Sequence, residues 1–267
     1  MLHILTFLVI IPPIETFYMS EFYETVNTWN GPLQYDEDWG YTDVRENAHI
    51  FWWLYAVKPK MNRPLILWLQ GGPGASGTGF GNFEETGPKT INSSDNPATW
   101  LQLADMVYVD SPVGAGFSYV DNEDAFTTNV TQIGHDLLVW IRQFLVIHPE
   151  YRIRPFFIFC ESYGGKVGAE FAQLITKEID IGNLQLNFCG LALGDSWISA
   201  MDYVNSWGQY LYANSYLDSN QLARVNAQAK QCQKKVDNNQ WTKATICWNQ
   251  MEDLIEMVDI LWNFPAP

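Results

Sequence analysis

Positive charge is scarce in this sequence, and its scarcity excludes one class of partner. The 267 residues contain 15 Lys and Arg against 30 Asp and Glu, which gives a net charge of −15. A field of this sign repels phosphate backbones, so we expect no nucleic-acid partner. The excess of carboxylates fits either ordinary solubility or an acidic compartment, where part of this charge is neutralised, and composition does not separate the two.

Long apolar runs are lacking as well. The uncharged run over residues 4–11 has the length of a signal-peptide core and is too short to span a bilayer. A basic flank is missing, because Arg45 is the first Lys or Arg of the chain. We interpret residues 1–20 as a secretory signal peptide and expect no stable membrane span. Asn-x-Ser/Thr triplets at Asn92 and Asn129 are glycosylation candidates, and these features together predict a secreted or a lysosomal or vacuolar protein.

Cysteine is limited to four residues, which allow three complete pairings. Cys160 ends one predicted strand and Cys189 precedes another, so in a parallel sheet they lie at opposite ends, too far apart to bond. Cys232 and Cys247 belong to two predicted helices of the same C-terminal segment and form the plausible disulfide. Two buried free thiols are the alternative there, and the sequence does not decide between them.

Apolar and aromatic residues are plentiful, at 47% and 15% of the chain, enough for a large core. Short apolar runs alternate with helical stretches, which is typical of an α/β fold. The first run favours an antiparallel hairpin and the later ones buried parallel strands. Helical spacing over residues 128–148 predicts a helix that packs on the sheet. The predicted strands are residues 50–57, 65–69, 106–109, 156–160 and 190–193.

The pattern changes after Gly194. Residues 219–236 and 241–260 predict two amphipathic helices with no strand between them. We therefore divide the chain into an α/β core over residues 21–200 and a helical cap or insertion over residues 201–267.

Ser162 stands where an apolar run breaks into the turn Glu-Ser-Tyr-Gly-Gly. This is close to the Gly-x-Ser-x-Gly elbow, in which small residues two positions either side of a nucleophilic serine let a strand and a helix approach. Gly164 fits that pattern and Cys160 replaces the first glycine. On this motif alone, an ordinary strand end is an equal alternative.

A glycine-rich turn follows the predicted strand over residues 65–69 and reads Gln-Gly-Gly-Pro-Gly-Ala-Ser. An acyl-transfer enzyme needs backbone N–H groups that face the developing oxyanion, one from such a loop and one from the residue after the nucleophile. Gly72 and Tyr163 are the candidates. The alternative is a phosphate-binding or structural loop, but neither common phosphate-loop pattern is present.

Several blocks, in order, resemble the serine carboxypeptidase family. Gln70, Ala75 and residues 194–198 are most similar to its retinoid-inducible branch. The resemblance extends from about Trp39 to near the C-terminus. The matching blocks are residues 68–76, 82–88, 96–100, 110–119 and 161–166.

This resemblance implies an α/β-hydrolase with a mostly parallel central sheet, flanking helices and a helical cap. It also implies a serine-type carboxypeptidase that releases amino acids from the C-termini of peptides and proteins, with Ser162 as the nucleophile, and without a metal or cofactor. Family positions that hold the substrate carboxylate map onto Gln70, Gly71, Glu84 and Glu161. Two glutamates facing a carboxylate must share protons, which favours binding at acid pH.

Histidine is scarce, and this limits catalysis. A serine nucleophile needs a base, and in this family the aspartate and histidine follow the serine. The four histidines are His3, His49, His135 and His148, all before Ser162. His135 is expected on a helix surface and His49 at a turn before a strand. We therefore expect the last strands of the family fold, which carry this aspartate and histidine, to be missing. We also expect the chain by itself to be inactive. A peptide-binding pseudoenzyme and an esterase or acyltransferase are the alternative functions.

Overall fold

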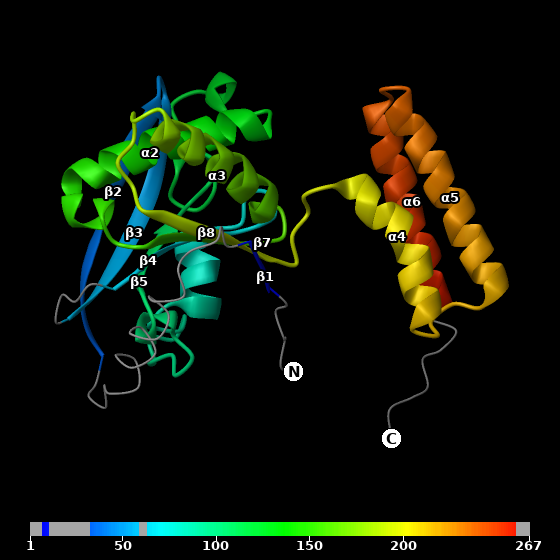
Figure 1. The fold of residues 1–267 in the computed structure, drawn as a ribbon, viewed down its shortest axis with the longest axis horizontal. Helices are drawn as coiled ribbons and strands as arrows, with labels where there is room; N and C mark the ends of the chain where they lie inside the picture. The colour runs from blue at the N-terminus through cyan, green and yellow to red at the C-terminus, as the bar shows by residue number, and fades with distance from the viewer. Residues whose placement is uncertain (1–6, 11–32, 59–62, 260–267) are drawn as a thin grey trace. The chain divides into compact units, whose positions relative to one another are not determined.

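The computed structural model describes residues 7–10, 33–58 and 63–259. Its residues divide into two compact units, Met1–Ile198 and Ser199–Pro267 (Figure 1). The first unit contains an eight-stranded sheet in the order β1-β8-β7-β4-β5-β3-β2, with β6 paired to β3 outside this path. The strands are β1 (Phe7–Ile10), β2 (Gln34–Arg45), β3 (Ala48–Lys58), β4 (Leu65–Leu69), β5 (Asp105–Val109), β6 (Tyr119–Val120), β7 (Phe156–Glu161) and β8 (Phe188–Gly194).

Four neighbouring strands, β8, β7, β4 and β5, run parallel. Their short all-apolar sequences, such as Leu-Ile-Leu-Trp-Leu in β4, suit strands that are buried on both faces. β3 joins β5 antiparallel, and β2 and β3 form a long hairpin. The expected α/β-hydrolase arrangement, a sheet with a parallel centre and flanking helices, is confirmed.

Alternate residues of the parallel strands enter two different cores. One core lies under α2 (Val130–Ile147) and α3 (Gly164–Asp180) and includes Leu67 and Ile158. The other includes Ile66, Trp68 and Tyr108. α2 and α3 lie on one side of the sheet, and the π-helical segment η1 (Gly77–Thr86) lies on the other (Figure 1).

Three single-turn 3-10 segments connect these elements: η2 (Trp100–Gln102), η3 (Glu123–Ala125) and η4 (Pro149–Arg152). The helix expected over residues 128–148 is present as α2, and Pro149 follows its end. β2 was not predicted, because exposed acidic residues interrupt its alternation.

β1 pairs antiparallel with residues 191–194 of β8. With β7 on its other side, β8 therefore has a neighbouring strand on both edges. Apart from β1, residues 1–20 lie outside the described part of the chain, and their interpretation as a signal peptide stays a prediction. Over the described residues, no helix has both the length and the apolar character needed to cross a bilayer.

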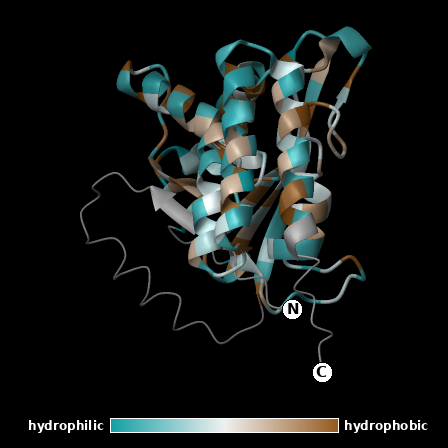
Figure 2. Ribbon diagram, turned by 90° about the vertical axis from the view of Figure 1, so that its right-hand side faces the viewer, coloured by the Kyte–Doolittle hydropathy of each residue, from teal (hydrophilic) through white to brown (hydrophobic). Residues whose placement is uncertain are grey.

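The second unit is a helical bundle of α4 (Ala200–Ala213), α5 (Ser219–Asp237) and α6 (Trp241–Asp259). Hydrophobic and hydrophilic residues alternate along its helices (Figure 2), and the buried ones, including Val204, Val225 and Met251, form a core of their own. α4 was not predicted. α5 begins at a capping box in which Asp218 and Gln221 satisfy each other's backbone N–H groups.

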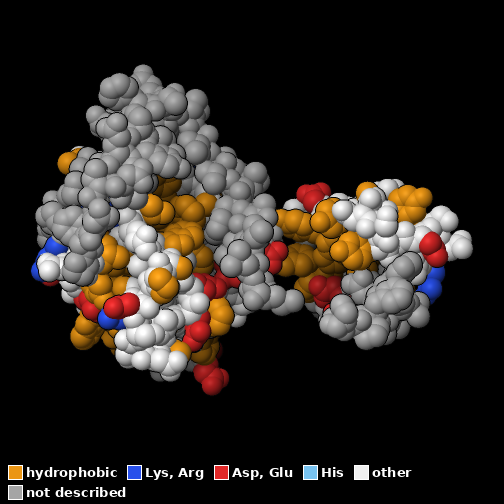
Figure 3. All heavy atoms as spheres, turned by 90° about the horizontal axis from the view of Figure 1, so that it is seen from below, with side chains coloured by type: hydrophobic (Ala, Val, Ile, Leu, Met, Phe, Trp, Pro, Cys, Tyr) orange, Lys and Arg blue, Asp and Glu red, His pale blue; other side chains and the backbone are white. Residues whose placement is uncertain are grey.

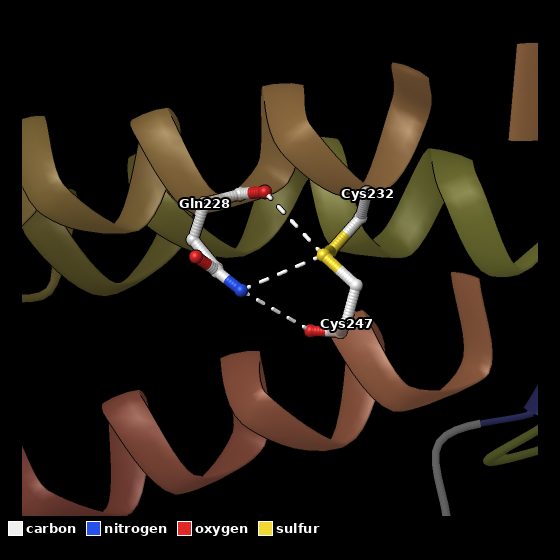
Figure 4. Close-up of a disulfide and its surroundings, with 3 residues drawn as sticks. All are labelled: Gln228, Cys232 and Cys247. Atoms are coloured by element: carbon white, nitrogen blue, oxygen red, sulfur yellow. Dashed lines mark hydrogen bonds between the residues drawn. A yellow bond between two sulfur atoms is a disulfide. The ribbon is translucent and has the colours of Figure 1, made fainter. Parts of the chain in front are cut away.

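A disulfide joins α5 to α6 through Cys232 and Cys247, whose Cα atoms are 5.4 Å apart. The amide of Gln228 donates to the Cys247 carbonyl at 3.5 Å and lies against the disulfide (Figure 4). Cys160 and Cys189 are free and buried. Of the two alternatives left open by the sequence, the structure contains the disulfide.

Candidate active site

The carboxyl ends of β4, β5, β7 and β8 meet at one edge of the sheet, where ligands bind in open α/β folds. The glycine-rich loop follows β4, Asp110 follows β5, Ser162 follows β7, and Asp195 and Ser196 follow β8. Four segments that are distant in sequence therefore contribute to one site.

Ser162 has the backbone of a strained strand-to-helix elbow. Its φ angle is 52°, in the left-handed region that a non-glycine residue rarely adopts. Its N–H donates to the Gly194 carbonyl at 2.9 Å, and its own carbonyl accepts from the N–H groups of Gly165 and Trp197, both at 3.0 Å. These three bonds hold the elbow between β8 and α3.

Two glycines allow the chain to pass close to the elbow. A Cβ added to Gly71 would lie 2.8 Å from the Cβ of Ser162, and one added to Gly164 would lie 2.5 Å from the Leu69 carbonyl oxygen. Both separations are shorter than any normal carbon contact. The glycine-rich loop therefore lies directly against the serine only because these positions lack side chains.

The expected oxyanion donors remain available in this arrangement. Within the described residues, no hydrogen bond of the protein uses the N–H of Gly72 or Tyr163. Gly72 has a φ of 113°, which suits glycine at that point of the loop. Tyr163 stands at the start of α3, whose positive end favours developing negative charge.

Cys160 takes the place of the first elbow glycine without blocking the turn. Its thiol is buried and donates to the Ala192 carbonyl at 3.3 Å. Gly168 of α3 makes room for the sulfur, since a Cβ there would lie 2.6 Å from Sγ. Burial raises the pKa of the Cys160 thiol to about 12, so this sulfur stays protonated and is not a second nucleophile.

Beside the nucleophile, the side chains of Gln70, Glu85 and Glu161 form an acidic cluster. The Trp68 indole donates to Gln70 Oε1 at 2.6 Å, and Gln70 Nε2 in turn donates to Glu161 Oε2 at 2.7 Å. Burial, and after it the neighbouring carboxyl of Glu161, raise the pKa of Glu85 to about 8. Glu85 therefore keeps its proton at acid pH and through most of the neutral range.

The glutamate that joins this cluster is Glu85 and not Glu84. Glu84 is exposed, whereas Oε2 of Glu85 is buried and has no hydrogen-bond partner in the described residues. The two side chains are adjacent in η1, and a helix turns neighbouring residues to different sides. In the sequence the two glutamates are adjacent, and only the direction that each side chain takes from η1 shows which one joins the cluster.

Asp110 connects the glycine-rich loop to the loop after β5. Its buried carboxylate accepts from Ser76 Oγ at 2.7 Å, from the N–H and hydroxyl of Thr78 at 3.0 and 2.7 Å, and from the N–H of Phe117 at 2.8 Å. Gly116 passes so close that a Cβ there would overlap this carboxylate. The sequence marked residues 110–119 as a block but gave Asp110 no role.

None of the described histidines reaches Ser162. His49 lies inside β3, not at a turn, between Asp43 at 2.6 Å and Asp121 at 3.0 Å. Strands lie about 4.8 Å apart, so the three strand steps from β3 to β7 amount to about 14 Å. His135 is exposed on α2, and His148 packs against Trp52 and Phe144. In the part of the chain that the structure describes, no three His, Cys, Asp or Glu side chains gather as metal ligands.

Both glycosylation candidates are exposed. Asn92 lies in a turn closed by the hydroxyls of Thr90 and Ser94, 2.6 Å apart. Asn129 is the N-cap of α2, and its side-chain oxygen accepts from the N–H of Gln132 at 2.9 Å. The nitrogen to which a glycan attaches is not used in that cap.

Comparison with known proteins gives one family. The sequence profile described as serine carboxypeptidase matches residues 28–263. The chain is 46% identical to the retinoid-inducible serine carboxypeptidase of Mus musculus, over 85% of this chain and 51% of that protein. It is 41% identical to serine carboxypeptidase-like 51 of Arabidopsis thaliana, over 82% of this chain and 49% of that protein. The chain thus spans about half the length of the curated relatives it matches.

Among solved structures, the fold is similar to that of Kex1(delta)p, a prohormone-processing carboxypeptidase from Saccharomyces cerevisiae. The TM-score is 0.69, with 20% sequence identity, over 82% of this chain and 53% of the yeast protein. At this identity the likeness concerns the fold alone.

Proposed function

Because the chain belongs to the serine carboxypeptidase family, we propose that it carries the nucleophile and the carboxylate-binding site of a peptidase that releases C-terminal amino acids. Ser162 Oγ forms a bond to the carbonyl carbon of the last peptide bond, and the C–N bond breaks as the terminal amino acid leaves with a proton. Water then hydrolyses the ester. The N–H groups of Gly72 and Tyr163 bind the oxyanion in both steps.

The observation that carries this proposal is the acidic cluster next to the nucleophile. Glu161 precedes Ser162 directly and is hydrogen-bonded to Gln70, and the pKa of its neighbour Glu85 is raised to about 8. A protonated carboxyl can donate to a substrate carboxylate, whereas two ionised ones repel it. With the Gly71 backbone beside it, the cluster favours a free C-terminus one residue beyond the bond that is cleaved.

Binding of a blocked dipeptide acid and of its C-terminal amide tests this assignment. At pH 5 we expect the acid to bind about tenfold or more tightly than the amide, because a charge-assisted hydrogen bond is lost. The preference should weaken as the pH rises toward 8 and Glu85 ionises. Isothermal titration of the full chain measures both ligands, and equal affinities would remove the cluster from this role.

A catalytic base is a separate requirement. Since no described histidine lies near Ser162, we expect these 267 residues alone to hydrolyse no peptide and to react slowly with fluorophosphonates. Rapid labelling of Ser162 at acid pH with turnover of a blocked dipeptide would contradict this.

The lack of a described histidine near Ser162 also favours a second candidate, a non-catalytic protein that binds peptide C-termini. It retains the acidic cluster, and its serine has no histidine partner among the described residues. Tight binding of the peptide acid without labelling in any form of the protein would favour it over the peptidase.

We assign residues 201–267 to a cap insertion of the hydrolase. We further propose a secretory route to a lysosome, a vacuole or the cell exterior, with glycans on Asn92 and Asn129. The exposure of both asparagines supports glycosylation. Enzymatic deglycosylation of secreted protein should increase its gel mobility, and Asn92→Gln and Asn129→Gln should each remove part of that shift.

A further inference from the structure

A group of aromatic rings lies exposed on β2, β3 and β6 and on the loop after β5. Register pairs Tyr41 with Phe51, and His49 with Tyr119, so their side chains project from one face of the sheet. Trp39, two residues from Tyr41, lies on this same face. We call this group the ring face; it consists of Trp39, Tyr41, Phe51, Phe117 and Tyr119.

The rings support one another through direct contacts. The ring of Phe51 lies 5.1 Å from those of Tyr41 and Phe117 and 6.3 Å from that of Trp39, and Tyr41 and Tyr119 are 5.5 Å apart. The Tyr41 hydroxyl donates to the Phe117 carbonyl at 3.1 Å. The ring face is therefore built before any ligand arrives, which lowers the ordering cost of binding.

These rings remain in contact with solvent although they are large and apolar. Trp39 is 62% exposed, Phe117 59%, Tyr41 48% and Tyr119 45%, around a buried Phe51. Patches of this kind on soluble proteins mark interaction sites, and Trp and Tyr contribute strongly to binding at such patches. Hydrophobic side chains gather elsewhere on the surface too (Figure 3), so the kind of ligand must come from the surrounding charge.

The charge around the ring face is negative. Arg45 is the single Lys or Arg in residues 37–55 and 117–124, and its guanidinium is bound to Asp136 at 2.8 Å. His49 stacks on Tyr119 and binds Asp43 and Asp121, while Glu123 and Asp124 are exposed and make no ion pair within the described residues. The acidic residues of these segments are Glu37, Asp43, Glu46, Asp121, Glu123 and Asp124, together with Asp38, which lies on the other face and pairs with His148.

From these rings and carboxylates together we infer that the ring face binds an extended cationic segment of a polypeptide, with arginine side chains stacked on the rings. The face of an aromatic ring attracts a guanidinium, and exposed carboxylates beside it add to the attraction. A second copy of this chain carries the same negative charge and fits poorly. None of these rings belongs to the carboxylate-binding cluster of Gln70, Glu85 and Glu161.

The test uses two labelled peptides, acetyl-(Gly-Arg)3-amide and the same peptide with citrulline in place of arginine. Citrulline keeps the shape and removes the charge, and the C-terminal amide prevents capture by the acidic cluster. Fluorescence anisotropy with the full chain at low salt should show binding of the arginine peptide, and binding at least about fivefold weaker for citrulline.

Trp39→Ala and Phe117→Ala should each lower the affinity for the arginine peptide about three- to tenfold, since each removes a stacking surface without changing charge. Trp241→Ala, which removes a ring of similar exposure from α6, is the matched control and should change affinity less than about twofold. Trp39→Phe keeps a ring and should retain most of the binding, which separates ring loss from misfolding.

Equal binding of the arginine and citrulline peptides would overturn the inference. So would unchanged affinity in Trp39→Ala and Phe117→Ala, because binding would then come from the net charge of the chain. Self-association in sedimentation that Trp39→Ala removes, without peptide binding, would assign the ring face to contacts between copies of this chain and likewise reject the inference.

Discussion

Adjacent residues of this protein differ sharply in their environment, and Glu84 and Glu85 are the clearest case. Glu85 is partly buried against Glu161, while Glu84 is exposed. The two glutamates are neighbours in the same sequence block, and only the fold shows which one lies beside the nucleophile.

Replacing Glu85 should change how stability depends on pH. The pKa of Glu85 is raised from 4.5 to about 8, so the folded state keeps a proton that the unfolded state loses between these values. Stability from this group is therefore fully present below about pH 4.5 and is lost as the pH rises through 8. Glu85→Gln removes that loss, so its stability relative to the parent chain should be about 1–3 kcal/mol higher at pH 8 than at pH 5.

Urea unfolding of both proteins at the two pH values measures this difference. Glu84→Gln is the matched control, because its exposed side chain should show the same difference from the parent chain at both values. A pH-independent effect of Glu85→Gln would show that the pKa of this carboxyl is not raised in the folded protein.

Among the elements, most buried strands and amphipathic helices could be predicted from the sequence. The turns that form the site could be predicted only in part. β4 and β7 stand out because continuous apolar runs end in glycine-rich or serine-centred turns. β2 was missed because it lies at a sheet edge with polar residues on both faces. The elbow motif predicted a strand-to-helix turn at Ser162, and the structure has one between β7 and α3. The connection through Asp110 depends on contacts between segments about 30 residues apart, which no local pattern records.

Asp110 holds η1 and the loop after β5 in register, and removing its carboxylate should be costly. Asp110→Ala leaves the hydroxyls of Ser76 and Thr78 and the N–H groups of Thr78 and Phe117 without their acceptor. We expect a loss of about 3–5 kcal/mol in the free energy of unfolding.

Asp95→Ala provides the comparison for the Asp110 variant. It removes an exposed ion pair with Lys89 and should cost less than about 1 kcal/mol. Equal losses in chemical denaturation of the two variants would mean that the Asp110 hydrogen bonds add nothing beyond a surface contact.

At the scale of the whole molecule, the two units have separate hydrophobic cores, and the disulfide belongs to the helical one alone. Cys232 and Cys247 are 15 residues apart in sequence, and a cross-link of that span stabilises by about 3 kcal/mol, chiefly by restricting the unfolded chain. Replacing both with serine should therefore lower the melting temperature of the helical unit and leave that of the sheet unit unchanged. Calorimetry of the full chain, with and without the substitutions, resolves the two transitions. A single transition that moves as a whole would show that the units unfold together, so that stability lost in the helical unit reaches the elbow at Ser162.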